Sequence, residues 1–146
     1  MIKRIFLAVL LAASSFAHAD VLSEYVRGGM SFLEARLGYP PHKRTPQLVA
    51  VPKEQMPCKY CDAAYIPEVI FIKIDLLQDS LYAEATVIHE LVHHYQHERG
   101  DAAYEGNCYA IIQGESEAER ARLKFLEVNH RFDRPRIPFC RGVGER

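Results

Sequence analysis

The pattern of apolar and polar positions predicts helices on either side of a short strand-rich region. Between positions 22 and 37, apolar residues recur every three or four positions, the spacing of one face of an α-helix. Gly38 can end this helix, and Pro40 prevents its continuation. The segments 48–51 and 69–74 are short and rich in β-branched residues, so both are expected to be strands.

Two longer helices are predicted in the second half of the chain. The first begins at Ser80, which can cap it, and ends just before Gly100. Asn107 can cap the second, which extends to about Val128. The tail 129–146 contains prolines and is expected to be irregular. With 146 residues in total, the chain is expected to form a single α+β domain.

The first 19 residues are predicted to be a secretory signal peptide. Lys3 and Arg4 provide a positive start, the apolar run 5–13 follows, and small residues precede an expected cleavage after Ala19. The apolar run is too short to span a bilayer, which needs about 20 apolar residues. We therefore expect an exported domain over 20–146, periplasmic or secreted, with no membrane span in the mature chain.

Composition and charge fit an ordinary globular protein, with 49% hydrophobic residues and a net charge of −1. The near-neutral charge gives no indication of a nucleic-acid partner. In an oxidising compartment the four cysteines predict two disulfides, and we favour Cys58–Cys61 with Cys108–Cys140. A redox-active Cys58–Cys61 pair is an alternative, but the strand-then-helix context of such pairs is missing. A zinc site of four cysteines would need a second close pair.

The seven histidines are unevenly distributed, because four of them fall between positions 89 and 97. His89 and His93 are four residues apart on a predicted helix, so both imidazoles project from one face and can bind one metal ion, usually zinc. Glu90 lies beside them and can take a proton from a zinc-activated water. The alternative is a surface helix with solvated histidines, yet the apolar stripe of Ile88 and Val92 places both histidines at its rim.

A catalytic zinc needs a third protein ligand and an open fourth position. The next helix carries three closely spaced glutamates, and its projection places Glu115 in the middle of the apolar stripe and Glu119 at the edge. We expect Glu115 to be the third ligand, with Glu119 as the next candidate. The alternative for Glu115 is a salt bridge to Arg122. His97, one turn beyond His93, could be a fourth ligand that closes the site and makes it structural.

The motif His89-Glu90-x-x-His93 followed by Glu115 resembles the gluzincin zinc metallopeptidases. The pattern from Glu115 to Glu119 is similar to the CAAX prenyl endopeptidase branch and to the single-domain minigluzincins, where the first glutamate binds zinc and the last position is usually aspartate. The segment 89–96 also resembles short exported bacterial proteins of unassigned function. The resemblance covers about residues 69–125 and implies a zincin-like fold that uses one zinc ion.

This resemblance implies a peptidase that acts on a peptide or protein substrate, and we expect a monomer. Glu90 would be the general base, and the strand 69–74 would be an edge strand that pairs with the substrate. The oxyanion would be held by zinc and one further donor. The candidates for that donor are His97, Tyr104, Arg122 and His130. Two other hypotheses are a non-catalytic zinc-binding or interaction protein and a toxin-like effector with one host substrate.

Overall fold

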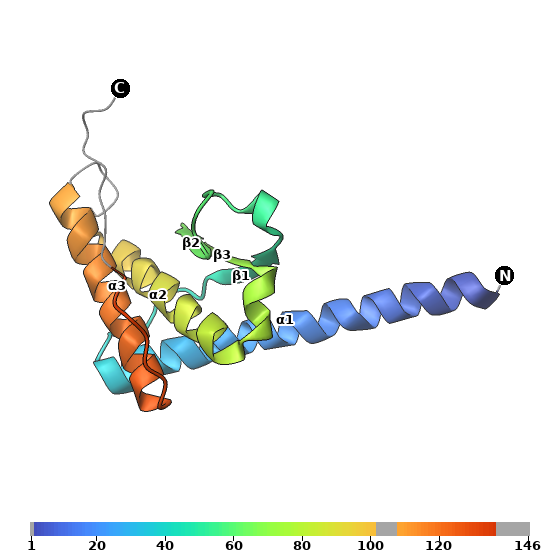
Figure 1. The fold of residues 1–146 in the computed structure, drawn as a ribbon, viewed down its shortest axis with the longest axis horizontal. Helices are drawn as coiled ribbons and strands as arrows, with labels where there is room; N and C mark the ends of the chain where they lie inside the picture. The colour runs from blue at the N-terminus through green and yellow to red at the C-terminus, as the bar shows by residue number, and fades with distance from the viewer. Residues whose placement is uncertain (1, 102–107, 137–146) are drawn as a thin grey trace, which may run out of the picture.

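The computed structural model describes residues 2–101 and 108–136, with side chains from Asp20 onward. The fold is α+β, as predicted (Figure 1). Three helices and a three-stranded sheet make up the described part of the chain: α1 (Ile2–Leu37), β1 (Gln47–Val51), β2 (Ala63–Ile66), β3 (Val69–Lys73), α2 (Ser80–Arg99) and α3 (Cys108–Val128). Short 3-10 turns lie at Lys53–Gln55 and Ile74–Gln78. The residues described after α3 form no helix or strand, as expected for the tail.

The strand order is β1-β3-β2, so β3 is the central strand. It pairs in parallel with β1 and antiparallel with β2. The expectation that β3 is an edge strand is therefore wrong, and β2 occupies that edge. The sequence pattern did not predict β2, because its four residues begin with two alanines, which have little strand preference. A tight turn in which Glu68 has φ 71° connects β2 to β3.

Helix α1 buries the apolar positions that its sequence period predicts. Val26, Met30 and Leu33 are all buried in the core. Gly38 ends the helix in a left-handed conformation with φ 73°. The helix begins at Ile2 and therefore also includes the segment predicted to be a signal peptide, whose cleavage stays a prediction. Among the described residues, no helix combines the length and apolar character needed to cross a membrane.

Helix α2 is the central element of the core and contacts α1, α3 and the sheet. Its buried positions include Ile88, Leu91 and Val92, which have no exposed surface. Asp79, rather than Ser80, caps its start: the Asp79 carboxylate accepts a hydrogen bond from the Tyr82 amide at 3.1 Å. At its other end Gly100 adopts φ 76°, as predicted. Packing against α1, α3 and the sheet therefore fixes the position of α2 in the fold.

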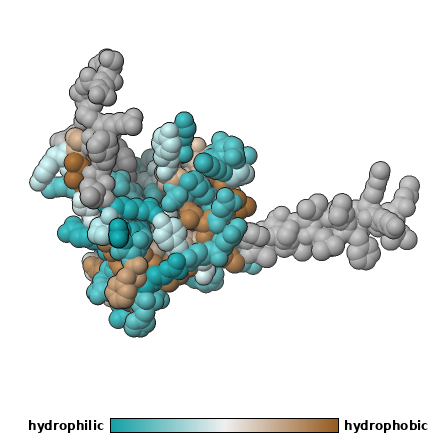
Figure 2. Space-filling view, in the orientation of Figure 1, coloured by the Kyte–Doolittle hydropathy of each residue, from teal (hydrophilic) through white to brown (hydrophobic). Residues whose placement is uncertain are grey.

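The outer surface is more polar than this core. Hydrophilic residues cover most of the face drawn in Figure 2, and hydrophobic residues appear between them in smaller areas. Large exposed hydrophobic side chains are spread over several elements, from Val21 on α1 to Val128 on α3. Such scattered apolar residues are normal on a globular surface.

A pair of glycines controls how closely α1 approaches α2. A Cβ atom at Gly29 would lie 2.6 Å from Leu91 Cδ1 and 3.1 Å from Ile88 Cγ1, whereas at Gly28 it would meet only Glu84 Oε1 at 3.0 Å. Both Gly→Ala changes gain the same helix propensity, but only Gly29→Ala overpacks the core. We expect Gly29→Ala to be about 1–3 kcal/mol less stable than Gly28→Ala in urea unfolding. Equal stability of the two variants would contradict this close packing.

Candidate metal centre

Two histidines of α2 and one glutamate of α3 converge on a single point. His89 Nε2 lies 3.3 Å from His93 Nε2 and 3.1 Å from Glu115 Oε2. His93 Nε2 lies 3.2 Å from Glu115 Oε1. Ligand atoms about 2.0–2.1 Å from a tetrahedral zinc ion are separated from one another by about 3.3 Å. The three predicted ligands therefore lie together with the spacing and donor chemistry that fit one zinc ion.

Gln96 holds His93 in the tautomer that metal binding needs. The Gln96 side-chain NH₂ donates to the Gly114 carbonyl and to the Glu117 carboxylate, both at 2.9 Å. These two acceptors orient the amide, so its oxygen faces His93 Nδ1 at 2.9 Å. His93 must then carry its proton on Nδ1, which leaves the Nε2 lone pair directed at the metal position. Sequence reasoning missed this role, although the spacing of three residues along α2 placed Gln96 beside His93.

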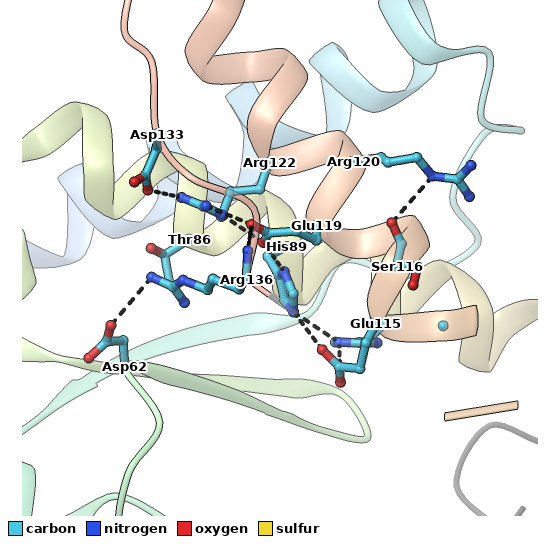
Figure 3. Close-up of polar contacts among 12 residues, drawn as sticks. Asp62, Thr86, His89, Glu115, Ser116, Glu119, Arg120, Arg122, Asp133 and Arg136 are labelled. Atoms are coloured by element: carbon cyan, nitrogen blue, oxygen red, sulfur yellow. Dashed lines mark hydrogen bonds and ion pairs between the residues drawn. The ribbon is translucent and has the colours of Figure 1, made fainter. Parts of the chain in front are cut away.

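Glu119 supports the second histidine. His89 Nδ1 is buried and has no hydrogen-bond partner within the described part of the chain. The Glu119 carboxylate faces it at 3.6 Å, an ion-pair distance that is too long for a hydrogen bond. Glu119 is itself held by the Arg122 guanidinium at 2.7 and 2.8 Å and by the Arg136 amide at 2.8 Å (Figure 3). A carboxylate behind a ligating histidine is a common means of orienting the ring.

Arg122 forms ion pairs with residues other than Glu115. It is fully buried between Glu119 and Asp133, whose carboxylate accepts its hydrogen bond at 2.8 Å. The alternative in which Glu115 forms a salt bridge to Arg122 is therefore wrong. Glu119, expected at the edge of the apolar stripe, is buried by this same network.

Burial and charge shift the protonation equilibria of the site. Burial raises the pKa of Glu90, which is 8% exposed, while the two neighbouring histidines and a hydrogen bond from the Tyr65 backbone oppose that rise. Burial lowers the pKa of His89, but the Glu115 and Glu119 carboxylates outweigh it and raise this pKa to about 9. Burial also opposes ionisation of Glu115, yet His89 and His93 hold its pKa well below the usual range. The cluster thus favours negative carboxylates around a shared positive charge.

These residues line a cleft of about 680 Å³. The metal cluster and Glu90 form one wall, and the loop from Cys58 together with β2 forms the other. A larger hollow of about 840 Å³ lies along α3 and is lined by residues that include Ser116 and Arg120. Glu119 and Arg136 line both hollows, and among the described residues no histidine or cysteine lines the larger one. Because the metal cluster lies in the smaller cleft, that cleft is the candidate active site.

Three of the four predicted oxyanion donors do not line the cleft, and one of them is the fully buried Arg122. His97 is exposed, and its Nδ1 is 3.2 Å from the Tyr65 hydroxyl rather than within the metal cluster. His130 is exposed just beyond α3 and does not line the cleft. Tyr104 lies outside the described residues. Arg136, which the sequence pattern did not single out, lines the cleft instead.

Another neighbour of the metal ligands also departs from expectation. His94, expected to be solvated, is 0% exposed. Its Nε2 donates to the Arg44 carbonyl at 2.8 Å, and its Nδ1 lies 3.2 Å from the Tyr65 hydroxyl. The histidine therefore ties α2 to β2, the strand that forms the opposite wall of the cleft.

One predicted disulfide lies at the rim of the cleft. Cys58 and Cys61 are disulfide-bonded, with their Cα atoms 5.7 Å apart. Cys108 is also disulfide-bonded, whereas Cys140, its predicted partner, lies outside the described residues. The Cys58–Cys61 pairing agrees with the preferred connectivity, and it constrains the loop that leads into β2.

Removal of the Glu119 charge should weaken metal binding without removing a ligand. We expect Glu119→Gln to lower zinc affinity about 10- to 100-fold, because His89 loses the negative group that orients its ring. The measurement is competition for zinc against a chelating dye. Glu127→Gln, an exposed position on the same helix, is the control and should bind zinc like the unmodified protein. Unchanged affinity in Glu119→Gln would contradict the supporting role.

Comparison of the chain with protein-family models, with curated proteins and with solved structures found no match, so its resemblance to gluzincin peptidases stays a prediction.

Proposed function

We propose that the protein is an exported zinc-dependent peptidase that hydrolyses peptide bonds. The observation that carries the proposal is the cluster of His89, His93 and Glu115, whose ligand atoms lie within 4.8 Å of one another beside a buried Glu90 in an open cleft. Three protein ligands leave one position of a tetrahedral ion free for water or substrate. This arrangement is typical of catalytic rather than structural zinc sites.

Different residues would bind the metal and transfer the proton. His89, His93 and Glu115 would hold the ion. When bound, zinc lowers the pKa of water to about 7 and polarises the scissile carbonyl. Glu90 would accept the proton of the attacking water and pass it to the leaving amine. Burial raises the pKa of Glu90, the direction that makes a carboxylate a better proton acceptor.

The free edge of β2 offers a place for an extended substrate. The Lys73 amide donates to the Asp62 carbonyl at 3.0 Å, so the alternation of antiparallel pairs directs the backbone groups of Ala63 and Tyr65 away from β3. The Tyr65 amide donates to Glu90, and Ala63 lines the cleft. A peptide could add to this edge as a further strand. We therefore expect a peptide substrate to pair with β2 rather than with β3.

The position of His97 favours this function over a closed zinc site. A closed site needs a fourth protein ligand, and His97 was the candidate for it. Its ring lies against Tyr65, outside the group of ligand atoms.

Metal removal and restoration test the proposal. We expect the purified protein to hold one zinc ion per chain, measured by elemental analysis, and to cleave peptides in a complex mixture analysed by mass spectrometry. A chelator should abolish the cleavage and added zinc should restore it. Stoichiometric zinc without cleavage of any peptide or protein in a broad panel would instead favour a non-catalytic zinc-binding protein.

A further inference from the structure

Arg136 occupies a defined position beside the metal ligands. Its backbone amide donates to Glu119 at 2.8 Å, which fixes the residue next to the group that supports His89. Its side chain extends away from His89 towards Asp62, at the start of the opposite wall (Figure 3). The side chain is 42% exposed. Among the described residues that line the cleft, Arg136 is the single arginine, and no lysine lines it.

The Arg136 guanidinium has donors to spare. Its Nη2 lies 3.5 Å from Asp62 Oδ2 and contacts the Tyr82 hydroxyl, and its Cζ lies 5.6 Å from the centre of the Tyr82 ring. Within the described part of the chain, no hydrogen bond engages Nε or Nη1. The Tyr82 ring therefore supports the guanidinium and leaves its Nε and Nη1 edge available. An edge of a guanidinium can bind a carboxylate through two parallel hydrogen bonds.

Arg136 is only weakly paired, because the neighbouring carboxylates have closer cationic partners. Asp62 has a closer partner in Lys73, whose Nζ lies 3.0 Å from Asp62 Oδ1. Loss of the weaker Arg136 contact would therefore not leave Asp62 unpaired. The Glu119 carboxylate likewise has a closer partner, because the Arg122 guanidinium lies 2.7 Å from it. A negatively charged group that enters the cleft would meet Arg136 without displacing a strong ion pair.

We propose that Arg136 determines substrate specificity by binding a carboxylate of the peptide, either its C-terminal carboxylate or an acidic side chain, within the metal cleft. This inference rests on the proposed function, because it places the peptide in the metal cleft. It adds a substrate class to that function: peptides that present a negative charge on the Arg136 side of the metal.

Zinc-anchored probes test this binding without turnover. The probes are three dipeptide hydroxamates that differ in one group: a free C-terminal carboxylate, a C-terminal amide, or a C-terminal amide with a glutamate side chain. Titration calorimetry on the zinc-loaded protein measures their affinities. We expect at least one of the two acidic probes to bind about 10- to 100-fold more tightly than the neutral amide. The acidic probe that gains affinity identifies the source of the carboxylate.

Arg136→Gln should reduce that preference to within about twofold, since it removes the guanidinium and keeps the backbone amide on Glu119. Arg120→Gln is the matched control, because Arg120 lies on α3 outside the metal cleft and should leave the preference intact. Equal binding of all three probes, or a preference that survives Arg136→Gln, would overturn this inference alone. Failure of every hydroxamate to bind the zinc-loaded protein would overturn the proposed function and this inference with it.

Discussion

Replacement of Glu90 by glutamine should reduce peptide hydrolysis about 10²- to 10⁴-fold, the contribution of a well-placed general base. Glutamine has the same shape, and its oxygen can still accept the hydrogen bond from the Tyr65 backbone. It cannot accept a proton from the attacking water. Glu90 is also not among the ligand atoms of the cluster, so zinc should remain bound. The loss should therefore appear in kcat, with an unchanged zinc content.

The matched control is Glu84→Gln, a half-buried glutamate on α2 that comes before Glu90 and lies outside the cleft. This variant should cleave peptides at the normal rate and hold the same amount of zinc. Initial rates with a peptide found in the mixture digest, together with elemental analysis, make both comparisons. Full activity in Glu90→Gln would exclude the proposed mechanism.

Replacement of His93 by alanine should lower zinc affinity about 10²- to 10³-fold, if a total of about 10–16 kcal/mol for four ligands is shared equally. The variant removes the Nε2 lone pair that the Gln96 network directs at the metal. Competition against a chelator of known affinity measures the change. A second readout is thermal unfolding, because a zinc concentration of about 100 times Kd should stabilise the unmodified protein by about 2.7 kcal/mol. The same zinc concentration should stabilise His93→Ala far less.

His97→Ala provides the control for this experiment. It removes an exposed imidazole from the same helix, one turn further along, whose ring contacts Tyr65. We expect it to bind zinc normally. A comparable loss of zinc affinity in His97→Ala would show that His97 is a fourth ligand and that the site is closed.

Local periodicity explains why the three expected ligands lie together. His89 and His93 share a face because four residues advance a helix by about 400°. Glu115 faces them because the projection of α3 placed it among the residues that turn inward, such as Gly114 and Ala118. Each of these inferences depends only on the geometry of one helix, which the sequence period already contains.

Errors and omissions have a common cause in long-range packing. β2 exists because β3 pairs with it, and that pairing makes β3 central rather than an edge strand. His94 is buried because Tyr65 and Arg44 close over it from other parts of the chain. The local pattern of α2 placed His94 away from the metal but could not indicate what covers it.

The sequence by itself determined that α2 carries a zinc-type motif, that α3 brings a glutamate close to it, and that α2 ends at Gly100. Tertiary structure alone decided the surroundings: the support of His93 by Gln96 and of His89 by Glu119, the wall formed by β2, and the place of Arg136 in the cleft. The physical reason is that helix geometry repeats within a few residues, whereas these contacts join segments whose meeting depends on the packing of the whole core.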